Sequence, residues 1–70
     1  MHDFARRFMR EAEGVWVCVE AAELLTPAGR IQVAVGARLM AGTRYMGMDV
    51  AHMLEEHYRR VRTNDNLRGP

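Results

Sequence analysis

The side chains that could perform chemistry in this 70-residue chain are few and scattered. Metal ligands would have to come from three histidines, one cysteine and nine acidic residues. His52 and His57 lie about 140° apart around the axis of a predicted helix, so one chain cannot bring both to one ion. Asp49, His52 and Glu56 share a helical face, but helix capping and surface polarity explain that spacing better than a metal site does. We therefore predict no metal and no cofactor.

Catalytic groups are equally sparse. Cys18 lies in an apolar run, which is typical of a buried, unreactive thiol, and the chain contains no serine. Glu55 and Glu56 are adjacent on the predicted helix and point about 100° apart, so they do not flank one substrate. The absence of lysine excludes a phosphate-binding loop of the P-loop type. We expect no enzymatic activity.

Composition also constrains the compartment and the partners. A lone cysteine excludes an internal disulfide, and no signal peptide is visible, so a cytoplasmic location is expected. Glu20 and Glu23 interrupt the longest apolar run before it reaches the roughly 20 residues of a membrane span. Ten arginines against nine acidic residues give a net charge of +1, which provides no strong field for nucleic acid or membrane.

The strongest structural signal is the stretch between Gly14 and Gly36, which predicts an antiparallel β-hairpin with arms 15–25 and 30–35. The turn is Thr26-Pro27-Ala28-Gly29, with Gly29 as a left-handed bulge residue. This turn places Leu25 opposite Ile31, so the odd-numbered residues share one core face. That predicted core face contains Val15, Val17, Val19, Ala21, Leu25, Ile31, Val33 and Val35.

A helix is predicted from about residue 50 to 62, with Asp49 as its N-cap. Its charged side contains Glu55 four residues before Arg59, and Glu56 four residues before Arg60. The segment 63–70 is predicted to be a disordered tail. The apolar stripe of the helix consists of Val50, Met53, Leu54, His57, Tyr58 and Val61.

The remaining segments complete an α+β domain over residues 1–62. Residues 3–12 fit either a helix or a strand, and a strand from about 5 to 10 is favoured because a two-stranded hairpin is marginal alone. A short strand is expected at 38–40, followed by a turn at 41–42, and residues 43–46 could pair back. The predicted fold is a small antiparallel sheet of three to four strands, covered on its odd face by the C-terminal helix.

Two functions are compatible with this fold. The even face with Trp16 and Leu24, together with the methionines Met46 and Met48, predicts a protein-binding surface and a homodimer, since 49% of a very small chain is apolar. If the segment containing Phe4 and Phe8 covers it, Trp16 is instead a core residue. The alternative function is nucleic-acid binding through Arg59, Arg60 and Arg62, joined by the other arginines before residue 50: Arg6, Arg7, Arg10, Arg30, Arg38 and Arg44.

Overall fold

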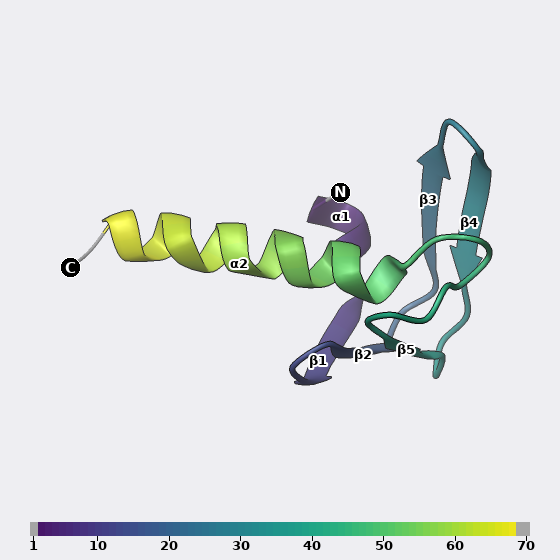
Figure 1. Cartoon of the computed structure of the whole chain (residues 1–70), viewed down its shortest axis with the longest axis horizontal. Helices are drawn as coiled ribbons and strands as arrows, with labels where there is room; N and C mark the ends of the chain where they lie inside the picture. Colours follow the sequence, from purple (N-terminus) through teal and green to yellow (C-terminus); the bar gives the residue numbers. More distant parts are fainter. Residues whose placement is uncertain (1, 69–70) are drawn as a thin grey trace.

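The computed structural model describes the backbone of residues 2–68 and the side chains of residues 3–62. It confirms the α+β class, with small antiparallel sheets and a C-terminal helix packed against them (Figure 1). The elements in chain order are α1 (His2–Ala5), β1 (Phe8–Ala12), β2 (Val15–Cys18), β3 (Ala22–Thr26), β4 (Gly29–Val33), β5 (Arg38–Met40) and α2 (Val50–Arg68).

The predicted hairpin forms, but it is longer than expected and bent in the middle. Its outer half is β3 paired with β4, and its inner half is β2 paired with β5. One register runs through both halves, from Val15 opposite Met40 to Thr26 opposite Gly29. At the bend, the Gly36 N–H donates to the Cys18 carbonyl at 2.8 Å, and Gly36 has a φ of 92°. The single predicted sheet is therefore divided into a three-stranded sheet, β1-β2-β5, and a two-stranded sheet, β3-β4.

The turn was predicted at the right place, but the predicted register is wrong by one residue. Gly29, with a φ of 135°, pairs directly with Thr26 instead of forming an extra bulge residue. Leu24 rather than Leu25 therefore lies opposite Ile31, and a shift of one residue exchanges the two faces of a strand. The buried face carries even-numbered residues of the first arm and odd-numbered residues of the second: Trp16, Cys18, Ala22, Ile31, Val33 and Leu39.

The first arm shows the consequence most clearly, because its predicted core residues face outwards. Leu25 is 72% exposed and Val19 is exposed as well, and Val35 at the end of the second arm is also exposed. Trp16, expected on the uncovered face, is only 6% exposed and meets the ring of Tyr58 edge to face, with 6.0 Å between the ring centroids. The alternative that Trp16 is a core residue is the one the structure shows.

The N-terminal segment contains both of the structures considered for it. The favoured strand, predicted at about 5 to 10, forms as β1 from Phe8 to Ala12 and pairs with β2, and it is preceded by the short helix α1. Phe4 of α1 packs against Phe8 with the ring centroids 5.0 Å apart, so α1 closes one side of the core. Glu11 lies where the β1–β2 register shifts, between Arg10 and Ala12.

Helix α2 begins where the sequence predicted. The Asp49 carboxylate accepts the His52 N–H at 3.0 Å, as an N-cap does, and also the Gly42 N–H at 2.7 Å. Both hydrogen bonds lower the pKa of Asp49, the one from His52 contributing most. The first turns of α2 pack on the concave face of the bent hairpin, where Val50 and Leu54 are fully buried. The second half extends beyond the sheets (Figure 1).

Two details of α2 differ from the prediction. The helix ends at Arg68 rather than at about Arg62, so it occupies the first part of the predicted tail, and residues 69–70 lie outside the described residues. The buried stripe is rotated around the axis, because Ala51 and Glu55 are buried whereas Val61 is exposed.

The strand predicted at 38–40 is confirmed as β5. Residues 43–46 form no strand, and only an isolated bridge joins Tyr45 to Met48.

We expect Trp16→Ala to lower the free energy of unfolding by about 3 to 5 kcal/mol, because it removes a large buried side chain and leaves a cavity. Met40→Ala, at a half-exposed strand position, should change it by less than about 1 kcal/mol. Urea denaturation followed by circular dichroism measures both. Equal effects of the two substitutions would contradict the assignment of Trp16 to the core.

Candidate functional site

An apolar surface lies on the side of the three-stranded sheet that faces away from α2. Trp16 and Leu39 point towards α2, so their strand neighbours point to the opposite, convex side. Two methionines on this side are strongly exposed: Met9 by 57% and Met40 by 50%. We call this surface the outer patch, and it consists of Met9, Val15, Val17 and Met40.

An ion pair crosses the outer patch. Met9, Val17 and Arg38 lie side by side across the three strands, and Val15 and Met40 form the next row. Arg38 Nε lies 3.1 Å from Glu11 Oε1, so an exposed ion pair spans the sheet from β5 to β1 on the same side as the patch. The carboxylate and the guanidinium therefore meet above the half-buried valines, so an ion pair crosses the middle of the outer patch.

The buried carboxylate of Glu55 holds α2 on the other side of this sheet. Glu55 accepts hydrogen bonds from the Arg10 guanidinium, with Nε 3.0 Å from Oε2 and Nη2 3.2 Å from Oε1, and from the Gly14 N–H in the β1–β2 turn. The Arg10 guanidinium also lies over the Tyr58 ring, 4.5 Å from its centroid. Arg59, the predicted partner of Glu55, instead lies 3.7 Å from Glu56.

Opposing effects act on the pKa of Glu55. Burial raises it, but the hydrogen bonds from Arg10 and Gly14 and the charge of Arg10 outweigh burial, and the pKa is lowered overall. A lowered carboxyl pKa means that the folded state binds the proton more weakly than the unfolded state does. The stabilisation is therefore complete above the ordinary value of 4.5 and is lost as the pH falls through the lowered pKa.

We expect Glu55→Gln to lower the free energy of unfolding at pH 7 by about 1.5 to 3 kcal/mol, because it removes charge-assisted hydrogen bonds to Arg10. The free energy of unfolding of the variant should also fall less than that of wild type as the pH drops below 4.5. Glu56→Gln, at a partly exposed position, is the matched control and should stay within about 0.5 kcal/mol of wild type. Urea denaturation between pH 3 and 7 tests this, and parallel pH profiles for wild type and Glu55→Gln would contradict it.

The residues expected to bind a partner do not form one exposed surface. Trp16 is buried, because the even face lies beneath α2. Leu24 and Met48 are half-buried and pack against the core, whereas Met46 is 62% exposed in the loop before α2. The outer patch was missed because the alternation of Val15 and Val17 was interpreted as a core face. The sequence offered no signal against that interpretation, because Met9, Val15 and Val17 are all apolar and suit a core face equally well.

Met46 has an unusual backbone conformation. Its φ is 51° and that of Gly47 is 84°, while Tyr45 and Met48 exchange backbone hydrogen bonds of 2.7 and 3.1 Å. Consecutive positive φ values across a two-residue hairpin turn are the pattern for which asparagine and glycine are favoured. A methionine with positive φ is strained there, typically by about 1 to 2 kcal/mol.

We expect Met46→Asn to raise the free energy of unfolding by about 0.5 to 1 kcal/mol, since asparagine tolerates the left-handed region. The same substitution at Met9, in an ordinary strand conformation, should give no gain. Chemical denaturation of both variants is the measurement. A destabilised Met46→Asn protein would show that the methionine side chain makes a contact worth more than the strain.

The arginines predicted to bind nucleic acid are exposed at the end of the described side chains of α2. Arg59 is paired with Glu56, Arg62 lies over the Tyr58 ring, 5.5 Å from its centroid, and Arg60 is exposed. Four of the arginines elsewhere are paired with acids, which weakens any common positive patch. These pairs are Arg7–Glu20, Arg10–Glu55, Arg30–Glu23 and Arg38–Glu11.

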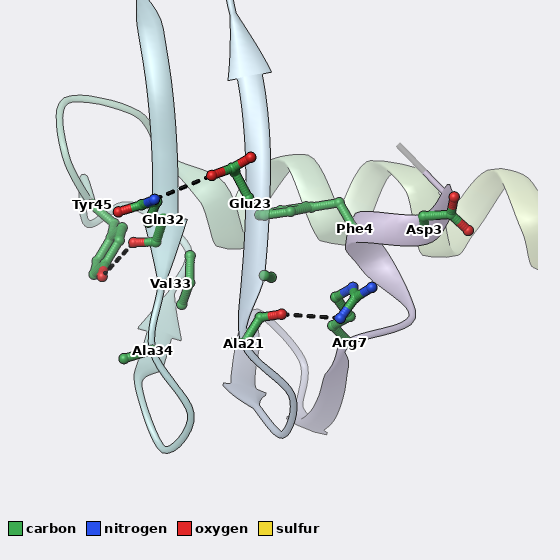
Figure 2. A pocket seen from close by; sticks show the side chains of 10 residues that line it. Asp3, Phe4, Arg7, Ala21, Glu23, Gln32, Val33, Ala34 and Tyr45 are labelled. Atoms are coloured by element: carbon green, nitrogen blue, oxygen red, sulfur yellow. Dashed lines mark hydrogen bonds between the residues drawn. The ribbon is translucent and has the colours of Figure 1, made fainter.

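A second candidate is a groove of about 740 Å³ where α1 meets the β3–β4 hairpin (Figure 2). Its floor contains the buried residues Phe4 and Val33. Figure 2 shows that polar groups of the groove are already hydrogen-bonded within the chain. Arg7 donates to the Ala21 carbonyl at 3.1 Å, and the Tyr45 hydroxyl donates to the Gln32 carbonyl at 3.1 Å. The volume suits a small ligand, but these bonds join the turn after α1 to the segment before β3, and the 41–49 loop to β4, and they leave few groups directed at a ligand.

Other kinds of site have little basis in the described residues. Within residues 3–62, no group of three or more histidine, cysteine or acidic side chains is placed to hold a metal ion. In the described backbone, no helix is long and apolar enough to cross a membrane. No family of proteins, no curated protein and no solved structure matches the chain.

Proposed function

We propose that this chain is a small, non-enzymatic protein-interaction module that binds protein through the outer patch, with homodimerisation as the simplest form of that binding. The observation that carries the proposal is a sheet face that α2 does not cover, with Met9 and Met40 exposed on it, while Glu55 fixes α2 to the opposite face. Because one helix cannot cover both faces of a sheet, the outer patch is the surface available to another chain.

The size and shape of the molecule support this proposal. A compact monomer of 8.0 kDa is expected to expose about 4,450 Å². This chain exposes 5007 Å² and measures 39 × 25 × 22 Å along its principal axes. The excess is consistent with an open sheet face and an extended helix, and association through the outer patch would cover the first of these. Exposed methionines also suit a protein-binding surface, since their side chains adapt to irregular partners.

Nucleic-acid binding through Arg59, Arg60 and Arg62 has less support. These arginines are exposed on the extended half of α2, but Arg59 is paired with Glu56, and the net charge of the chain is +1. A cytoplasmic location fits the proposed module, because Cys18 is a buried free thiol and such thiols are typical of reducing compartments.

We expect wild-type protein to associate with increasing concentration and Met40→Glu to remain monomeric, because the substitution places a charge within the apolar rows. Leu25→Glu is the matched control: Leu25 is also exposed, but it lies on the other sheet, and its variant should associate like wild type. Sedimentation velocity over a concentration series, with circular dichroism to verify folding, is the measurement. Wild-type protein that stays monomeric at millimolar concentration would contradict self-association.

A further inference from the structure

The β3–β4 hairpin has two outer edges with unpaired backbone groups. Only β3 and β4 form this sheet, so each strand has a neighbouring strand on one side only. A two-residue loop is closed by a hydrogen-bonded pair of residues, which here is Thr26 with Gly29. Hydrogen-bonded and non-bonded pairs alternate along an antiparallel ladder, so every second residue of each strand directs its N–H and C=O away from the other strand. These outward residues are Glu23 and Leu25 of β3 and Arg30 and Gln32 of β4.

The edge of β4 is covered by the chain itself. The Tyr45 hydroxyl donates to the outward carbonyl of Gln32 at 3.1 Å, as the alternation requires (Figure 2). The loop that contains Tyr45 also lines a cavity of about 210 Å³ together with Arg30, the other outward residue of β4. The 41–49 loop therefore lies along this edge.

The edge of β3 is covered only at its start. Arg7 Nη1 donates to the outward carbonyl of Ala21, and Phe4 of α1 lies beside the same end of the strand (Figure 2). Further along β3, the described part of the chain provides no backbone partner for the outward groups of Glu23 and Leu25. The tip of the hairpin projects away from the other elements, and Leu25 is 72% exposed (Figure 1). Two residues of extended backbone therefore present two donors and two acceptors to solvent.

We propose that the open edge of β3 binds an extended peptide segment of another protein, which adds to the hairpin as a third, antiparallel strand. This site is separate from the outer patch and does not depend on it. An extended backbone places alternate N–H and C=O groups at the spacing that Glu23 and Leu25 present. Two peptide residues, separated by one, each exchange a pair of hydrogen bonds with these two residues. A two-stranded sheet is marginal alone, so the added strand also stabilises the hairpin.

The side chains at this edge set the preferred peptide sequence. Glu23 and Leu25 both point to the exposed face of the hairpin. The peptide residue that pairs with Leu25 is apolar and the residue that pairs with Glu23 is basic, because directly opposed side chains on one sheet face stabilise each other in these combinations. In an antiparallel strand the residue opposite Leu25 comes first. The preferred segment is therefore apolar, any residue, basic.

A second copy of β3 suits this edge less well than a separate peptide does. Symmetric antiparallel pairing that uses both outward residues has one register, in which Glu23 of each copy pairs with Leu25 of the other. This register places an acid beside an apolar side chain twice. It also sets Pro27, which has no N–H to donate, against Ala21. The Ala21 carbonyl is already bound to Arg7. A peptide that ends before α1 avoids these conflicts.

N-methylation of a peptide at alternate positions tests this site. The probe is the acetylated and amidated peptide Thr-Thr-Val-Thr-Arg-Thr-Thr, whose valine pairs with Leu25 and whose arginine pairs with Glu23. In an NMR titration it should shift the amide signals of Glu23 and Leu25 and slow their hydrogen exchange. Methylation of the valine and arginine nitrogens removes both donors to β3 and should weaken binding at least ten-fold. Methylation of the two threonine nitrogens on either side of the arginine, which point away from β3, should change the affinity by less than three-fold.

The reversed peptide Thr-Thr-Arg-Thr-Val-Thr-Thr is the control for sequence, because its composition is the same. It should bind at least three-fold more weakly than the probe, since antiparallel pairing then sets arginine beside Leu25 and valine beside Glu23. The inference is overturned if the two methylated peptides bind equally, if the reversed peptide binds as well as the probe, or if the shifted signals lie outside β3. Absence of any shift at millimolar probe would overturn it as well.

Discussion

The register of the bent hairpin is the constraint on which the rest of this structure depends. Because one register runs from Val15 opposite Met40 to Thr26 opposite Gly29, the concave face is continuous across the bend. Trp16 and Val33 therefore contribute to one core although they belong to different sheets. A shift of one residue would reverse every side chain of the first arm, bury the valines and expose the tryptophan. The turn thus decides which face becomes core and which remains available to a partner.

Helix α2 stabilises this difference between the two faces of the sheet by packing on only one of them. Its first turns fill the concave face with Val50 and Leu54, and the buried Glu55 carboxylate joins the helix to β1 through Arg10 and to the β1–β2 turn through Gly14. A buried carboxylate with a charged partner and a backbone donor is favourable in one geometry and costly in others, so it specifies where the helix lies. Fixing α2 on one side of the β1-β2-β5 sheet leaves the other side, the outer patch, uncovered.

The sequence was sufficient for features that depend on local chemistry. The Asp49 cap, the turn at 26–29 and the strand at 38–40 are each specified by a few adjacent residues, and all three are present. The predicted register was wrong because it depends on whether Gly29 pairs with Thr26 or forms a bulge. Both conformations suit a glycine with positive φ. The role of Glu55 could not be predicted from the sequence, because its partner Arg10 is 45 residues away. Arg59, at the preferred helical spacing, was the nearer candidate partner. The partner-binding surface was predicted on the wrong face because the register error exchanged the two faces of the first arm.

The central proposal is that a second copy of the chain covers the outer patch of the β1-β2-β5 sheet. Isotope-filtered NMR on a mixture of labelled and unlabelled protein tests it most directly, because it detects contacts between copies only. The account predicts intermolecular contacts of the Met9 and Met40 methyl groups with methyl groups of the outer patch of the other copy, and none from Leu25 on the other sheet. Absence of contacts at the outer patch in concentrated protein, or contacts confined to Met46 and Leu25, would contradict it.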